Sequence, residues 1–70
     1  MHITAMFQRD GDGWVAWAIE VPAAMTQGDT REEARENLID AVREVLAEAR
    51  EAASRDAAPD AIQERIEVAA

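Results

Sequence analysis

The chain has 70 residues, enough for a single small domain, which we place at residues 1–70. Its hydrophobic fraction of 49% overstates the core, because 16 of those residues are alanine and only 18 are larger. Fifteen acidic residues against seven arginines and no lysine give a net charge of −8, which argues against direct nucleic-acid or anionic-membrane binding and favours a basic partner.

Two strands joined by a tight turn are predicted at the start of the chain. Residues 2–9 alternate between apolar and polar side chains, as a half-buried strand does. The next four residues contain Asp-Gly twice, and Gly11 and Gly13 predict a hairpin turn there because glycine accepts positive φ without steric cost. Residues 14–21 predict a second strand. Both of its faces are apolar, which is typical of a strand covered on two sides.

The rest of the chain predicts a short strand, a long helix and a last strand. Residues 25–28 predict the short strand, which ends at Gly28. The helical pattern continues to about Ala53 and stops in residues 54–59. Residues 62–68 predict the last strand. We therefore expect an α+β fold of order β-β-β-α-β, with a small, mostly antiparallel sheet and one long helix packed on one face.

The start of the helix carries a capping box. Thr30 follows Asp29 as the predicted N-cap, and Glu33 stands three residues later. In this motif each of the two side chains accepts a hydrogen bond from the other residue's backbone N–H. We expect both hydrogen bonds at the first turn.

The predicted helix has two halves of opposite character. At about 100° per residue, its apolar side chains between Ala34 and Ala53 fall on one half, which we expect to pack on the sheet. The other half is almost entirely acidic. Its carboxylates at successive i,i+4 positions are Glu32, Glu36, Asp40, Glu44 and Glu48. A solvated face is the simpler explanation, and a surface kept acidic for a cationic partner is the alternative.

The two tryptophans are expected to face opposite sides of the sheet, since Trp14 and Trp17 have opposite parity in one strand. One packs under the helix, and the other lies on the face that a single helix cannot cover, flanked by Ala16 and Ala18. Apolar patches of this kind are typical of interfaces. Together with the small core, the patch favours a homo-oligomer, either a dimer or a tetramer; a solvent-facing tryptophan without a role is the alternative.

No set of residues predicts catalysis, a metal site or a cofactor. His2 is the only histidine and Ser54 the only serine, so no nucleophile–base pair can be built around them. The Asp-Gly repeat resembles a calcium loop only at its start, because Trp14 and Val15 stand where an oxygen ligand and a glycine are required. A ribonuclease H-type nuclease needs carboxylates on its first strand, and residues 2–9 contain none. We expect a protein that is not an enzyme.

The cell compartment is predicted from what the sequence lacks. It contains no cysteine, which excludes disulfides and thiolate metal sites and favours a reducing compartment. It also shows no basic leader followed by an apolar run and no long apolar stretch. We therefore expect a soluble cytoplasmic protein.

The order and spacing of several short motifs resemble the HicB antitoxin family. The family pattern is a G-Y-V-A-Y-like strand, an L-P-G-C-like turn, T-Q-G-D-T, and E-E-A followed by an asparagine. The matching residues here are Gly13-Trp14-Val15-Ala16-Trp17, Val21-Pro22, Thr26-Gln27-Gly28-Asp29-Thr30, Glu33-Ala34 and Asn37. The match runs without a gap from Gly13 to about Leu46, and the flanking strands are compatible with it.

The chain departs from the family pattern in the turn after the second strand. Ile19 replaces a proline, Ala23 a glycine and Ala24 a cysteine. We therefore expect the choice of partner to differ from that of typical members. Longer members append a helix-turn-helix or ribbon-helix-helix domain that binds DNA. These 70 residues contain no such addition, and we expect no DNA binding from them.

The resemblance implies a partial ribonuclease H-like fold without catalysis, and a HicA-like partner. HicA proteins are small, basic, RNA-cleaving toxins with a double-stranded-RNA-binding-like fold, and the antitoxin covers the toxin's active site. The candidate interface residues for a toxin or a second copy are Trp14, Trp17, Glu32, Glu36, Asp40 and Glu44. The alternative is a solitary oligomeric module of the same fold, without a toxin partner, that binds another protein or a small ligand.

Overall fold

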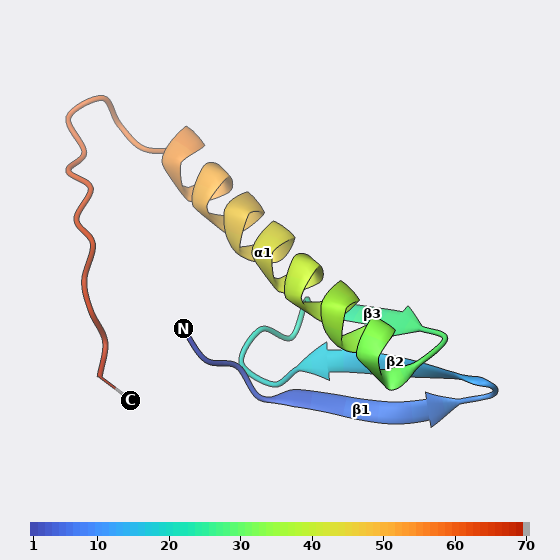
Figure 1. Ribbon diagram of the computed structural model, residues 1–70. Coiled ribbons are helices and arrows are strands. Elements are labelled where there is room, and N and C mark those ends of the chain that lie inside the picture. Colours follow the sequence, from blue (N-terminus) through green and yellow to red (C-terminus); the bar gives the residue numbers. More distant parts are fainter. Residues whose placement is uncertain (70) are drawn as a thin grey trace.

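The computed structural model describes residues 1–69, which form a three-stranded sheet and one long helix (Figure 1). Strands β1 (Ala5–Asp10), β2 (Gly13–Ala18) and β3 (Met25–Gly28) are antiparallel and lie in the order β1-β2-β3. Helix α1 (Arg31–Arg55) crosses one face of this sheet. The predicted α+β class, the antiparallel sheet and the single long helix are confirmed.

The strand register fixes which side chains share a face of the sheet. Met6 of β1 lies opposite Trp17 of β2, and Trp17 lies opposite Met25 of β3. Since successive side chains point to opposite faces, these three form one row on the same face. The hairpin that sets this register turns through Gly11, whose φ of 60° suits glycine.

The core lies between the sheet and α1 and is small, as the composition predicts. Its buried apolar residues are Ala16, Ala18, Val21, Ala24, Ala34, Leu38 and Val42. Four of these seven are alanines, and Leu38 is the largest side chain that is fully buried. Phe7 and Trp14 pack against the core from its margin and are half-buried.

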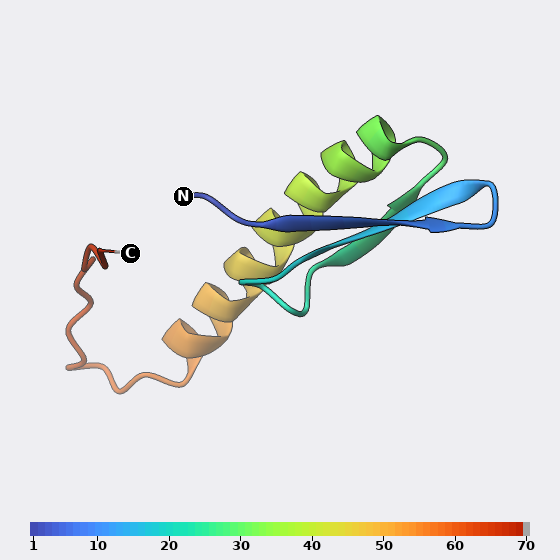
Figure 2. The same cartoon turned by 90° about the horizontal axis from the view of Figure 1, so that it is seen from below.

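Strand β2 is shorter than predicted and is covered on one face only. It ends at Ala18, and the chain then turns so that Val21 is buried in the core instead of continuing the strand. Backbone hydrogen bonds from Ala18 to Ala24, from Val21 to Ala18 and from Ala24 to Val21 close this turn. Helix α1 is the one described element that packs on the sheet (Figures 1 and 2). The prediction of a β2 strand covered on both faces is therefore wrong for the isolated chain.

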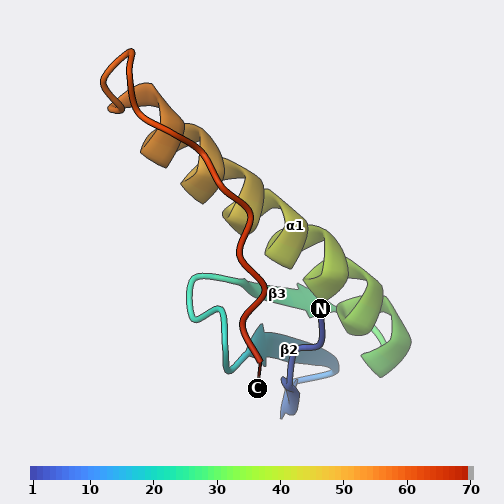
Figure 3. The same cartoon turned by 90° about the vertical axis from the view of Figure 1, so that its left-hand side faces the viewer.

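The predicted strand at residues 62–68 is also wrong. Helix α1 runs well past the sheet, and all its residues from Ala47 to Arg55 are exposed (Figures 1 and 3). The segment that follows, residues 61–69, has no regular secondary structure, and Ile62 is 93% exposed. An alternating pattern makes a strand only where a neighbouring strand accepts its backbone hydrogen bonds, and the chain leaves α1 far from either edge of the sheet.

The long helix is not a membrane span. Within the described residues, no helix combines the length and the apolar composition needed to cross a bilayer.

Candidate partner-binding surfaces

The predicted acidic half of the helix is present on α1, and we name it the acidic ridge. It consists of Glu32, Glu36, Asp40, Glu44 and Glu48, all of which are exposed. The buried side of α1 is formed by Ala34, Leu38 and Val42, centred about 160° around the helix axis from the middle of the ridge. The ridge therefore points away from the sheet and into solvent.

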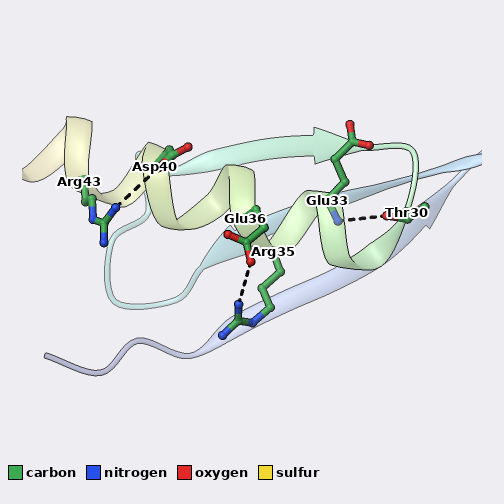
Figure 4. Close-up of polar contacts among 6 residues, drawn as sticks. All are labelled: Thr30, Glu33, Arg35, Glu36, Asp40 and Arg43. Atoms are coloured by element: carbon green, nitrogen blue, oxygen red, sulfur yellow. Dashed lines mark hydrogen bonds and ion pairs between the residues drawn. The ribbon is translucent and has the colours of Figure 1, made fainter.

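Two arginines of α1 neutralise the ridge only in part. Arg35 contacts Glu36 at 3.3 Å, and Arg43 contacts Asp40 at 3.8 Å (Figure 4). All four of these side chains are more than half exposed, and ion pairs of this kind contribute little to stability. The carboxylates thus stay accessible to an incoming cationic surface.

The first turn of α1 holds only half of the predicted capping box. The backbone N–H of Glu33 donates to the Thr30 hydroxyl at 3.0 Å, so Thr30 is the N-cap as predicted. The return hydrogen bond, from the Thr30 backbone N–H to the Glu33 carboxylate, does not occur among the described residues. Figure 4 shows the carboxylate pointing away from Thr30. Glu33 therefore adds its charge to the exposed helix surface.

Glycine is required where β3 meets α1. A Cβ atom added to Gly28 would lie 2.5 Å from the backbone nitrogen of Ala34, so only glycine permits this approach. Asp29 is exposed in the connection that follows. A Cβ on Gly13 would likewise lie 2.9 Å from the carbonyl oxygen of Gly28. The turn and cap residues of the sequence motif thus set the position of α1, and with it the position of the acidic ridge.

Trp14 and Trp17 lie on opposite faces of the sheet, as predicted, so they do not form one site. Trp14 lies on the helix-covered face, where the Arg9 guanidinium stands 5.2 Å from its ring centre. Trp17 lies on the other face and is half-buried, so the prediction of an exposed tryptophan there is wrong. Ala16 and Ala18 share the helix-covered face with Trp14 and are fully buried, so the prediction that they flank an exposed tryptophan is wrong.

The second surface is the sheet face opposite α1, which we name the open face. Two cross-strand rows form it, and its residues are Met6, Trp17 and Met25, then Gln8, Val15 and Gln27. Met6 is 42% exposed and Met25 is 66% exposed. Nothing in the sequence alone marks either methionine as an interface residue. The hairpin register could have predicted Met6, because a turn at Gly11 places Met6 opposite Trp17.

The two residues weighed as catalytic groups from the sequence lie apart in the structure. His2 is exposed ahead of β1, and Ser54 is exposed near the end of α1. No group of three or more histidine, cysteine, aspartate or glutamate residues within positions 1–69 could hold a metal ion. The candidate sites of the described residues are therefore the two surfaces defined above.

Comparisons with known proteins identified no relative of this chain. No family model matches the chain, and neither a curated protein nor a solved structure matches it. The likeness to the HicB antitoxins thus depends on the motifs in the sequence alone.

Proposed function

We propose that this chain is a HicB-like antitoxin. It binds a small, basic, HicA-type toxin in the cytoplasm and covers the site at which that toxin cleaves RNA. The observation that carries the proposal is the acidic ridge, which projects from the surface of α1 and is only partly neutralised by Arg35 and Arg43. The motif from Gly13 to Leu46 supports the same assignment.

Charge gives the proposed complex its mechanism. A toxin that binds the phosphates of RNA must present a cationic surface. A row of carboxylates one helical turn apart can bind that surface in place of the phosphates. Attraction between opposite charges also raises the rate at which antitoxin and toxin meet. Repulsion between like charges slows association of the antitoxin with other acidic proteins. The antitoxin would therefore need no catalytic residue of its own.

The first test is native mass spectrometry of the lightly tagged protein isolated from its own host. We expect a complex with a small, basic, histidine-containing protein, encoded in an adjacent reading frame. That protein should cleave RNA when isolated and stop when the purified chain is added. A homo-oligomer with no second protein would favour the alternative, a solitary module that binds another protein or a small ligand.

The second test reverses charges on the ridge. The triple variant Glu36→Arg, Asp40→Arg and Glu44→Arg should weaken toxin binding by about a hundredfold, because it replaces attraction with repulsion at the contact. A matched control makes the same change of charge outside the ridge, in the exposed residues Asp60, Glu64 and Glu67. The control should keep toxin affinity within about threefold. Equal losses in both triples, or no loss in either with the fold intact, would remove the ridge from the mechanism.

A further inference from the structure

The open face carries larger apolar side chains than the fully buried part of the core. Met6, Trp17 and Met25 form a row across all three strands, and Ile19, which follows β2, is 55% exposed beside it. The core, by contrast, holds Leu38 as its largest fully buried side chain. Trp17 is half-buried between the two exposed methionines. A small domain gains little by leaving such a row partly in water, unless a second layer covers it.

The two rows that form the open face are uncharged, and the one ionisable strand residue with the same orientation stands in the next row, at the hairpin. None of its six side chains is ionisable, in a chain of which 31% of residues are charged. The first ionisable residue with the same orientation is Asp10, at the hairpin end of β1. A basic protein would find only this one carboxylate at the end of the open face, whereas the acidic ridge offers five on the other side of the molecule.

We propose that the open face binds the open face of a second copy of this chain. The charge distribution selects this occupant, since each copy carries a net charge of −8 and can approach another closely only where it bears no carboxylates. Two such sheets pack face to face about 10 Å apart. Both helices then lie on the outside, and the two acidic ridges are separated by both sheets, farther apart than the Debye length of about 8 Å.

The arrangement suits a two-fold interface, in which the same patch meets itself. Trp17 is on the central strand with a methionine on either side, so each tryptophan can lie against the flexible methionine side chains of the other copy. Gln8 and Gln27 flank Val15 in the next row, where their amides can donate and accept hydrogen bonds without adding charge. Such a dimer would also cover β2 on both faces, which is what its apolar sequence indicates.

The size of the face sets the strength of the dimer. Three strands of this length give a face of roughly 300 Å² in plane. That is below the roughly 800 Å² that each partner buries in a standard interface. We therefore expect reversible association in the micromolar to millimolar range rather than a permanent dimer.

Sedimentation equilibrium of the purified chain, from about 10 µM to 1 mM, tests the proposal. The mass should rise with concentration from 7.7 kDa towards twice that value. Met6→Lys and Met25→Lys should each weaken association at least about tenfold, because they bury a charge in the interface. The matched control is Ile62→Lys, which changes a more exposed apolar residue outside the sheet and should associate like the unaltered chain. Unaltered protein that stays monomeric at about 1 mM, or a Met25→Lys variant that dimerises normally, would overturn the proposal.

A measurement on the unaltered chain guards against variants that fail to fold. Mild peroxide oxidises methionine in proportion to its exposure, and Met1, at 84% exposed and outside the open face, serves as the internal reference. Relative to Met1, Met6 and Met25 should be oxidised several times more slowly at high protein concentration than in dilute solution, where only their exposure in the single chain sets the rate. Protection that does not change with concentration would contradict the dimer. This result is independent of the toxin, because a chain that dimerises but binds no toxin supports the open-face proposal and contradicts the proposed function.

Discussion

Asn37 donates a hydrogen bond from Nδ2 to the backbone carbonyl oxygen of Gln27 over 2.9 Å, and it thereby joins the second turn of α1 to the edge strand β3. Both residues belong to the motif that resembles the HicB family, ten positions apart. The contact gives that spacing a physical reason. The edge strand gains a side-chain partner for one of its backbone carbonyls, and the helix is held in one orientation over the sheet.

Replacing Asn37 with alanine should lower the free energy of unfolding by about 1 kcal/mol, the usual net value of such a hydrogen bond. Urea unfolding followed by far-UV circular dichroism measures the change. The control is Gln63→Ala, which removes an exposed amide from the segment after α1 and should leave stability unaltered. A loss of equal size in both variants would contradict a specific role for the Asn37–Gln27 contact.

Two glycines should respond differently to alanine, since they are required for different reasons. Gly28→Ala places a Cβ against the backbone of Ala34 and should cost about 3 kcal/mol, because neither backbone segment can move away cheaply. Gly11→Ala meets no atom within 4 Å and suffers only from its φ of 60°, at a cost of about 1 kcal/mol. Unfolding midpoints of the two variants in urea should follow this order. The reverse order would mean that the turn, and not the β3–α1 junction, limits stability.

The small core predicts high sensitivity at Leu38, which is 1% exposed. Leu38→Ala removes the largest fully buried side chain and should cost about 3 kcal/mol, a large share of the stability of a domain of this size. The control Leu46→Ala removes the same atoms from a half-buried position at the margin of the core and should cost less than half as much. Thermal unfolding of both variants measures the difference. Similar losses would contradict the placement of Leu46 at the margin of the core.

The parts of the fold that were predictable from sequence are those with local causes. Alternation and the Asp-Gly turn located β1 and β2, and the Thr30 cap with its periodic apolar residues located α1. The two errors have non-local causes. A strand at residues 62–68 would need a sheet edge within reach. Burial of the β2 face opposite α1 would need a second layer of structure. Neither condition can be read from a pattern within the segment itself.

The two candidate surfaces also differ in whether local sequence patterns predict them. The acidic ridge was predictable, because helical periodicity alone places its carboxylates on one side. The open face was predictable only in part. Trp17 could be assigned to it by parity, whereas Met6 and Met25 join it through the pairing of three strands.

Glu20 binds Thr4 at the end of the sheet opposite the hairpin, and this contact should make the stability of the fold depend on pH. The Thr4 backbone N–H donates to its carboxylate at 2.6 Å, and the Thr4 hydroxyl donates at 2.7 Å. These hydrogen bonds, with that of the backbone first, lower the pKa of Glu20 below its ordinary value of 4.5. Because the pKa of this carboxyl is lower in the folded chain than in the unfolded chain, the ionised group stabilises the fold at pH values above the ordinary pKa. That stabilisation is lost as the pH falls through the lowered pKa.

Glu20→Gln should therefore be less stable than the unaltered chain near pH 7 and should approach it near pH 3. Urea unfolding of both proteins across this range measures the difference. Glu51→Gln, a change at an exposed carboxylate of α1 with no hydrogen bond to another described residue, serves as the control and should show no such convergence. A Glu20→Gln deficit that is constant with pH would mean that the carboxylate charge is not what binds Thr4.

The acidic ridge and the open face share no residue and lie on opposite sides of the molecule, so changes to them should act independently. Met25→Lys should leave toxin affinity within about threefold while it weakens self-association. The ridge triple variant should do the reverse. Each reversal adds two positive charges, so the net charge changes from −8 to −2 and the repulsion between copies falls. Self-association of the triple variant should thus be equal to that of the unaltered chain or stronger. A triple variant that dimerises more weakly would place the contact between copies on α1 instead of the open face.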